Sequence, residues 1–166
     1  GGESSLPGID VVGAIVLPGT LSYLNQFFDA KLIVANGAPA GSGAVLRNVT
    51  GAIRLPRGSS GEELLRLAWT NPRVAPGQKV PVLTAANRSD VGPGMQGYAS
   101  WTVEGLEAGT HSLRIDIEAE LDRPGRDPKP LTGVTQAAVE VVDPRFHLTF
   151  SHPDVVRKDE PYTLFV

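Results

Sequence analysis

The chain has 166 residues, no cysteine and a net charge of −3 at pH 7. The absence of cysteine excludes a disulfide framework, a thiolate zinc site and a cysteine nucleophile, and the slightly acidic balance argues against a phosphate-driven nucleic-acid interface. Gly and Pro make up about a fifth of the chain, which is typical of short strands joined by many turns, and no apolar run approaches the ~20 residues of a membrane span.

The first nine residues carry neither an initiator Met nor the basic and apolar regions of a signal peptide. We therefore expect residues 1–9 to be a linker or a processed terminus. Strict alternation then predicts a strand in which Phe28, Ala30, Leu32 and Val34 point to the core. After a Gly-rich loop, a further strand is predicted whose shared face carries Val49, Gly51, Ile53 and Leu55.

The stretch Glu62–Thr70 fits two structures. Ser60 followed by Glu63 is a capping-box pattern, which favours a short helix, whereas Leu65, Leu67 and Trp69 alternate with polar or small residues, as a strand would. We favour the strand because its neighbours are strands. Pro and Gly punctuate residues 71–97, which we expect to be mostly loop with one short strand over Lys79–Leu83.

The second half of the chain predicts three more strands, over Tyr98–Val103, His111–Leu121 and Thr132–Val142. His111–Leu121 is the clearest, because apolar and charged residues alternate throughout, and a strand that is wet on one face belongs to an antiparallel sheet packed on one side. About seven short strands without an alternating helix predict an all-β, antiparallel two-sheet sandwich over residues 10–143.

The last segment repeats the beginning of the chain. Leu148–Val166 (LTFSHPDVVRKDEPYTLFV) and Ile15–Val34 (IVLPGTLSYLNQFFDAKLIV) both run from a short apolar strand, through a Pro-containing turn and a polar stretch, into a second strand. Residues 144–166 are therefore expected to be the first two strands of a second, incomplete module. The apolar side chains of this tail are candidate interface residues: Phe146, Leu148, Phe150, Tyr162, Leu164 and Phe165.

Two phrases resemble a known family. Trp101–Ile117 (WTVEGLEAGTHSLRIDI) resembles the penultimate strands of bacterial immunoglobulin-like modules, and Pro161–Val166 (PYTLFV) resembles the second strand of CARDB-like repeats, for which Val34–Gly37 supplies the following Asn-containing turn. The loop over Gly58–Gly97 is longer than a minimal module needs. The resemblance implies an immunoglobulin-like sandwich within a large secreted or surface protein of repeated modules, without catalysis in the module itself.

The sequence contains few patterns that would indicate a catalytic or metal site. His111, His147 and His152 lie on different segments without tight ligand spacing, and we expect them at the surface or at the module boundary. The row Asp116, Glu118 and Glu120 is explained by a solvated strand face. Arginines oppose a cation in the loop Asp122–Asp127, and we expect ordinary turns there and at Asn87–Gly94. We therefore predict no catalytic residue, no metal site and no cofactor.

Aromatic side chains offer the remaining candidate site. A sugar-stacking platform is one interpretation of the six aromatics Tyr23, Phe27, Phe28, Trp69, Tyr98 and Trp101, although most large aromatics are buried. Phe28 and Trp101 fit the core, whereas we expect Tyr23 and Trp69 to be exposed.

The resulting hypothesis is a non-catalytic structural or adhesive module of a multidomain bacterial extracellular protein. The expected partners are neighbouring immunoglobulin-like modules, other copies of the chain, a glycan or a surface protein, with no nucleic acid and no membrane span. Two alternatives remain open. One is a carbohydrate-binding module, which an exposed Trp69 beside a groove would support, and the other is a filament subunit assembled by strand donation from the C-terminal segment.

Overall fold

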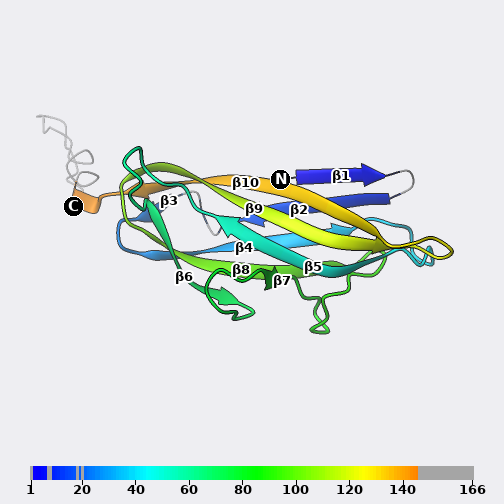
Figure 1. Cartoon of the computed structure of the whole chain (residues 1–166). Coiled ribbons are helices and arrows are strands. Elements are labelled where there is room, and N and C mark those ends of the chain that lie inside the picture. The colour runs from blue at the N-terminus through cyan, green and yellow to red at the C-terminus, as the bar shows by residue number, and fades with distance from the viewer. Residues whose placement is uncertain (1, 7–8, 18, 20, 146–166) are drawn as a thin grey trace, which may run out of the picture.

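The computed structural model describes residues 2–6, 9–17, 19 and 21–145, and it shows two β-sheets packed face to face (Figure 1). Over these residues the chain forms ten strands. Their bounds are β1 Gly2–Leu6, β2 Ile9–Val16, β3 Leu21–Tyr23, β4 Phe27–Asn36, β5 Val45–Arg54, β6 Leu65–Asn71, β7 Val80–Pro81, β8 Gln96–Gly105, β9 Gly109–Asp122 and β10 Lys129–Val142.

Each sheet has five strands. The order in sheet A is β1-β2-β4-β8-β6, and the order in sheet B is β3-β10-β9-β5-β7. All neighbours are antiparallel except β3 and β10, which run parallel over the register Leu21↔Glu140 to Tyr23↔Val142. The predicted all-β, two-sheet sandwich is confirmed, with this parallel pair as the departure from a purely antiparallel arrangement.

The core lies between the sheets and follows the alternation of β4 and β9. The residues Phe28, Leu32 and Val34 of sheet A and Leu113, Ile115 and Ile117 of sheet B are all buried, and they belong to one apolar cluster. Because successive side chains of a strand point to opposite faces, burying this set leaves the intervening residues on the outside of the sandwich. The predicted core register is confirmed.

Trp101 is the largest fully buried side chain, and it requires a glycine on the facing sheet. A Cβ added to Gly51 of β5 would lie 2.8 Å from Trp101 Cη2 and 3.0 Å from Leu32 Cδ2. Gly51 therefore leaves room in the core for the Trp101 indole, because a larger side chain would not fit between the indole and β5 without displacing one of them.

A buried polar residue ties the end of β4 to the loops around it. Asn36 Nδ2 donates to the carbonyl oxygens of Ala44 and Val91, both at 2.9 Å, and its Oδ1 accepts from the Ala38 amide at 3.0 Å. The sequence suggests only a turn at this position. The side chain serves two segments that are remote in sequence, so it fixes the path of both loops at once.

Three predictions about secondary structure can be compared with the observed strands. The stretch Glu62–Thr70 contains a strand rather than a helix, because Leu65–Asn71 pairs with β8, while residues 62–64 lead into it. Part of the expected N-terminal linker forms β1, which pairs with β2 from Gly2↔Gly13 to Leu6↔Ile9. The long segment between β6 and β8 is mostly loop, as expected, and its one strand is the short β7 beside β5.

Residues 146–166 of the predicted second module lie outside the described residues, including Phe146, Leu148, Phe150, Tyr162, Leu164 and Phe165. The domain boundary at Asp143-Pro144 and strand donation by this segment therefore stay predictions. Light scattering tests them directly: we expect the full chain to associate and a chain ending at Asp143 to be monomeric. Two monomeric chains of equal stability would contradict the repeat interpretation.

A candidate binding surface on sheet A

The outer face of sheet A carries several exposed apolar side chains. Registers among β2, β4, β8 and β6 place side chains of paired residues on one face. Four large apolar residues of this outer face are more than a third exposed: Val12 (39%), Val16 (44%), Phe27 (54%) and Trp69 (46%). Isolated exposed apolar residues are ordinary, but a series of them on one sheet face points to an interaction surface.

Phe27 and Trp69 meet on this face, with ring centroids 5.6 Å apart and ring planes tilted by 35°. Phe27 faces solvent because the next residue, Phe28, occupies the core. Trp69 reaches the same face because a bulge between Leu67 and Trp69 shifts the register of β6, so that Trp69 lies opposite Thr102. We call these two rings the aromatic pair.

Polar side chains border the aromatic pair on both sides. Arg66 donates from Nη2 to Glu104 Oε1 at 2.8 Å, and this hydrogen bond raises the pKa of Arg66. The Thr102 hydroxyl donates a short hydrogen bond to Asp29 Oδ1. Phe27 lies directly opposite Glu104 in the β4–β8 register, and Trp69 lies opposite Thr102. Each ring therefore has beside it a polar side chain whose position is fixed by a hydrogen bond to a neighbouring residue.

Further along the same face, Lys31 Nζ lies 4.5 Å from the centroid of the Tyr98 ring. The Lys31 ammonium therefore lies over the face of the Tyr98 ring, as in a cation–π contact. Tyr98 also donates from its hydroxyl to Gln96 Oε1 at 3.0 Å. Tyr98 is therefore half-buried and engaged, in contrast to the aromatic pair.

Trp69 also stands at the rim of a groove of about 310 Å³ between β5 and β6. Thr70 holds one wall of the groove: its hydroxyl donates to the Pro72 carbonyl at 2.8 Å and accepts from the Val74 amide at 3.1 Å. The groove is lined by Ala52, Ile53, Leu67, Ala68, Trp69, Thr70, Arg73, Val74, Ala75, Pro76, Gly77, Gln78 and Trp101.

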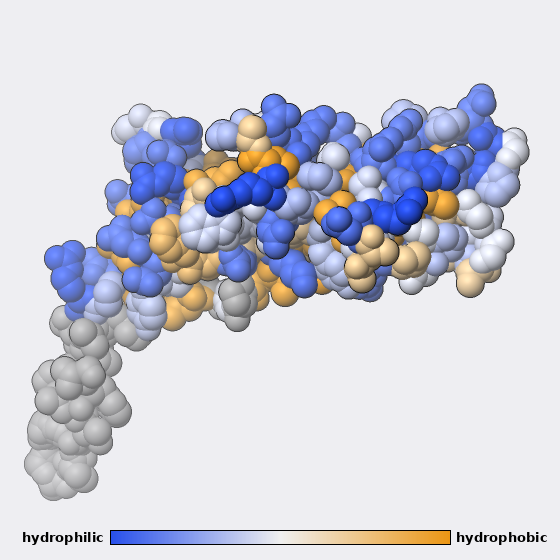
Figure 2. Space-filling view, turned by 90° about the horizontal axis from the view of Figure 1, so that it is seen from below, coloured by the Kyte–Doolittle hydropathy of each residue, from blue (hydrophilic) through white to orange (hydrophobic). Residues whose placement is uncertain are grey.

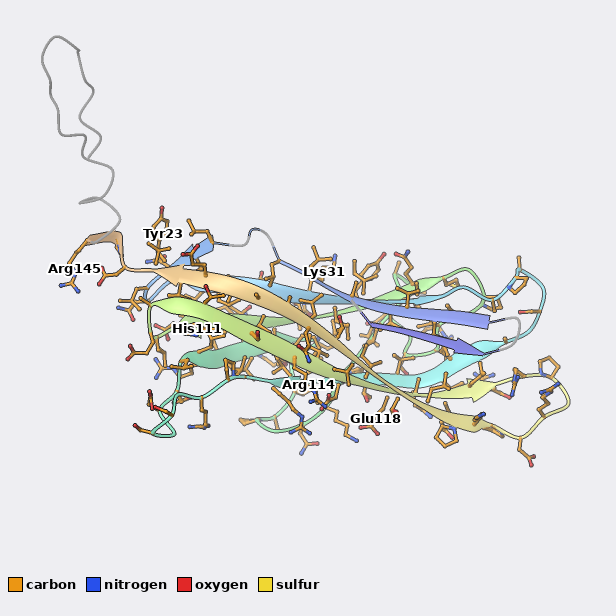
Figure 3. All side chains as sticks on the ribbon, turned by 90° about the horizontal axis from the view of Figure 1, so that it is seen from above. Tyr23, Lys31, His111, Arg114, Glu118 and Arg145 are labelled. Atoms are coloured by element: carbon orange, nitrogen blue, oxygen red, sulfur yellow. The ribbon has the colours of Figure 1, made fainter. Side chains whose placement is uncertain are left out.

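The structure separates the two residues that the sequence singles out. Tyr23 is 41% exposed and Trp69 46% exposed, as expected, but Tyr23 lies on β3 of sheet B at the end of the sandwich where β10 finishes (Figure 3). They therefore do not form one site. Phe27, which shares the site with Trp69, was not among the residues expected to be exposed. The signal was present, because a Phe next to a core residue on a strand must face outward.

The outer face of sheet B is charged, as the alternation of β9 predicts. Asp116 accepts from Arg54 and Arg114, Lys79 pairs with Glu118 at 2.7 Å, and Arg47 joins Asp90 and Asp122 at 3.0 and 2.7 Å. The hydrogen bond from Arg54 is the main reason that the pKa of Asp116 lies below its usual value. Figure 3 shows Arg114 and Glu118 on one side of the sandwich and Lys31 on the opposite side.

The remaining polar candidates have structural partners. His111 is buried, contrary to expectation, because it shares the inward face of β9 with Leu113 and Ile115. Its Nε2 lies 2.7 Å from the Glu107 carbonyl oxygen. His147 and His152 lie outside the described residues. Asp90 and Asp122, from the two loops considered for calcium, both contact Arg47. Within the described ranges, no three His, Asp or Glu side chains gather as a metal site would require.

Comparison with known proteins reveals similar folds among solved structures. The chain is similar to the CARDB domain of a Pyrococcus furiosus protein at 12% identity and a TM-score of 0.45, over 81% of this chain and 95% of that one. It is similar to the ASH/PapD-like domain of human CEP192 at 13% identity and a TM-score of 0.44, over 84% and 90%. The collagen-binding subdomain of the Enterococcus faecalis surface protein ACE follows at 13% and 0.34, over 83% and 99%.

No family model matches the chain, and no curated protein matches it. Among the residues that the structure describes, no helix has the length and apolar character to cross a membrane. The expected likeness to CARDB-like immunoglobulin-like modules is met among the solved structures, two of which are CARDB domains. The structure itself shows an all-β sandwich of two five-stranded sheets.

Proposed function

We propose that this sandwich is a non-catalytic structural or adhesive module of a larger bacterial extracellular protein, and that it acts through the outer face of sheet A. The carrying observation is the contact between Phe27 and Trp69, both about half exposed on the face that also exposes Val12 and Val16. On sheet B, ion pairs line β5 and β9, and the exposed apolar residues lie apart on β3 and β10. Water-exposed apolar surface is unfavourable unless a partner covers it.

In the view from below, hydrophilic residues dominate the upper margin of the molecule, and hydrophobic residues are exposed among the others (Figure 2). The partners in this proposal are neighbouring immunoglobulin-like modules, other copies of the chain, a glycan or a surface protein. The extracellular setting and the repeated array belong to the proposal through the resemblance in sequence.

Retention of protein-coated beads under flow tests the proposal. Beads carrying the full chain pass over surfaces coated with extracellular-matrix protein, with polysaccharide or with the same chain. We expect retention on at least one surface and its loss in a Phe27→Ser/Trp69→Ser double variant. The matched control is Lys79→Ser/Glu118→Ser, which removes an exposed ion pair from sheet B and should leave retention unchanged. Equal retention of both variants, or no retention of the wild type, would contradict the proposal.

A second candidate, a carbohydrate-binding module, is favoured by one specific observation. Trp69 is half exposed and stands at the rim of the groove between β5 and β6. Binding of soluble oligosaccharides, measured by calorimetry, separates this function from adhesion to protein surfaces.

A further inference from the structure

We propose that the aromatic pair and its polar border form a binding site for a neutral glycan chain, whose sugar rings stack on Phe27 and Trp69. The inference deepens the proposed function, because it names the ligand class that the adhesive face would take. It starts from the rings themselves. Each is about half exposed, and each supports the other at 5.6 Å, so both hold their positions without being covered.

The shape of the pair suits a chain of sugars better than a flat partner. The two ring planes are tilted by 35°, so together they present a shallow angle rather than one plane. A pyranose ring has an apolar face of C–H groups, which packs on an aromatic face, and an edge of hydroxyls that remain hydrogen-bonded. The centroid separation is comparable to the length of one sugar ring, so neighbouring sugars can each contact one ring.

The polar border supplies partners for those hydroxyls. Glu104 and Asp29 carry acceptor oxygens, Arg66 carries several N–H donors, and each has a hydrogen-bonded neighbour that restricts its rotation. Glu104 and Asp29 lie opposite Phe27 and Thr102 in the β4–β8 register, so the acceptors flank the rings. Preorganised polar groups around an apolar centre are the usual composition of a small-ligand site.

The charge of the face selects a neutral ligand. On the outer face of β4, β6 and β8 the described charged residues are Asp29 and Glu104 against Lys31 and Arg66, which balance. An anionic glycan or a single-stranded nucleic acid would also stack on aromatics, but both require a positive groove to offset their charge. This face has no such excess, and the adjacent groove adds a single positive residue, Arg73.

The groove beside Trp69 extends the site past the pair. Its walls carry both apolar residues such as Ile53 and polar ones such as Gln78 and Arg73, and it holds about 310 Å³. A glycan that stacks on Trp69 can therefore continue into a recess along β6. This predicts affinity that rises with chain length from a disaccharide to a longer oligosaccharide.

Pull-down by insoluble cellulose and chitin and by resins coated with mannan or xylan, followed by calorimetry with the matching soluble oligosaccharides, tests the site on the full chain. We expect the wild type to bind at least one, and Trp69→Ala and Phe27→Ala each to weaken binding at least about tenfold, as truncation of an aromatic anchor does. Trp69→Phe should recover part of the affinity, because it restores a stacking face.

Tyr23→Ala is the matched control, because Tyr23 is an equally exposed aromatic on the other sheet. It should leave affinity unchanged, and far-UV circular dichroism confirms that each variant is folded. The proposal is overturned if the wild type binds none of the four polysaccharides, or if Trp69→Ala binds as tightly as the wild type. Bead retention on protein surfaces without glycan binding would overturn this site and leave the adhesive module standing.

Discussion

The two outer faces of this sandwich are built on the same core but present opposite chemistry. On sheet B, Asp116, Glu118 and their arginine and lysine partners neutralise one another in solvent. On sheet A, Phe27 and Trp69 pack against each other and stay about half exposed, beside the Arg66–Glu104 ion pair. The difference shows that the pattern of inward residues specifies the fold, while the outward residues are free to differ and so carry the function.

The largest effect should come from the core that both faces share. Ile115→Ala removes buried methyl groups beneath the charged face, and Leu32→Ala does the same beneath the apolar face. Each should lower the free energy of unfolding by about 2–5 kcal/mol, measured by chemical denaturation. A loss below about 0.5 kcal/mol for either would mean that the residue behaves as a surface position.

Gly51→Ala probes the packing between the faces. The new Cβ would lie 2.8 Å from Trp101 Cη2, so the indole or β5 must move, and we expect a loss of about 1–3 kcal/mol. Gly133→Ala on β10 is the control, because its Cβ would meet nothing within 4 Å. A change in stability within about 0.5 kcal/mol is expected there. Equal losses for the two variants would show that the Trp101 contact is not the cause.

Trp69→Ala tests the apolar face. Stability should fall by only about 0.5–1.5 kcal/mol, the contribution of an aromatic contact, because the side chain is already half exposed. Ligand binding should suffer far more than folding. A core-sized loss of stability in thermal or denaturant unfolding would indicate that Trp69 serves the fold rather than a partner.

Asp116→Asn tests the charged face and should have the smallest effect, about 0.2–1 kcal/mol at neutral pH. The folded state lowers the pKa of Asp116 from 3.8, chiefly through the hydrogen bond from Arg54. The carboxylate therefore stabilises the fold above its unfolded-state pKa, and this contribution disappears as the pH falls through the lower folded-state value. The stability difference between variant and wild type should shrink below about pH 4. A constant difference down to pH 2 would refute the assignment.

Alternation was the part of the sequence that predicted the structure well. It placed the buried residues of β4 and β9, the wet carboxylates of β9 and the strand over Glu62–Thr70, because a period of two leaves little freedom once one face is buried.

Features set by tertiary context were not predictable in this way. The bulge in β6 that turns Trp69 toward Phe27 has no local signature in the sequence. The parallel pairing of β3 with β10 joins residues that are more than a hundred positions apart. His111 is a different case, because the alternation of β9 already places it on the inward face with Leu113 and Ile115, although we expected it at the surface.

The pairing of β10 has a mechanical consequence. This strand is bonded to β9 from Lys129↔Leu121 to Val141↔Gly109, and to β3 on its other edge over Glu140–Val142. Inter-strand hydrogen bonds lie across the strand direction. Tension applied at Val142 along the strand axis therefore loads all of these bonds in shear at the same time, rather than one after another. We expect one high rupture force in single-molecule pulling from this end; a series of small ruptures would indicate that β10 peels away bond by bond.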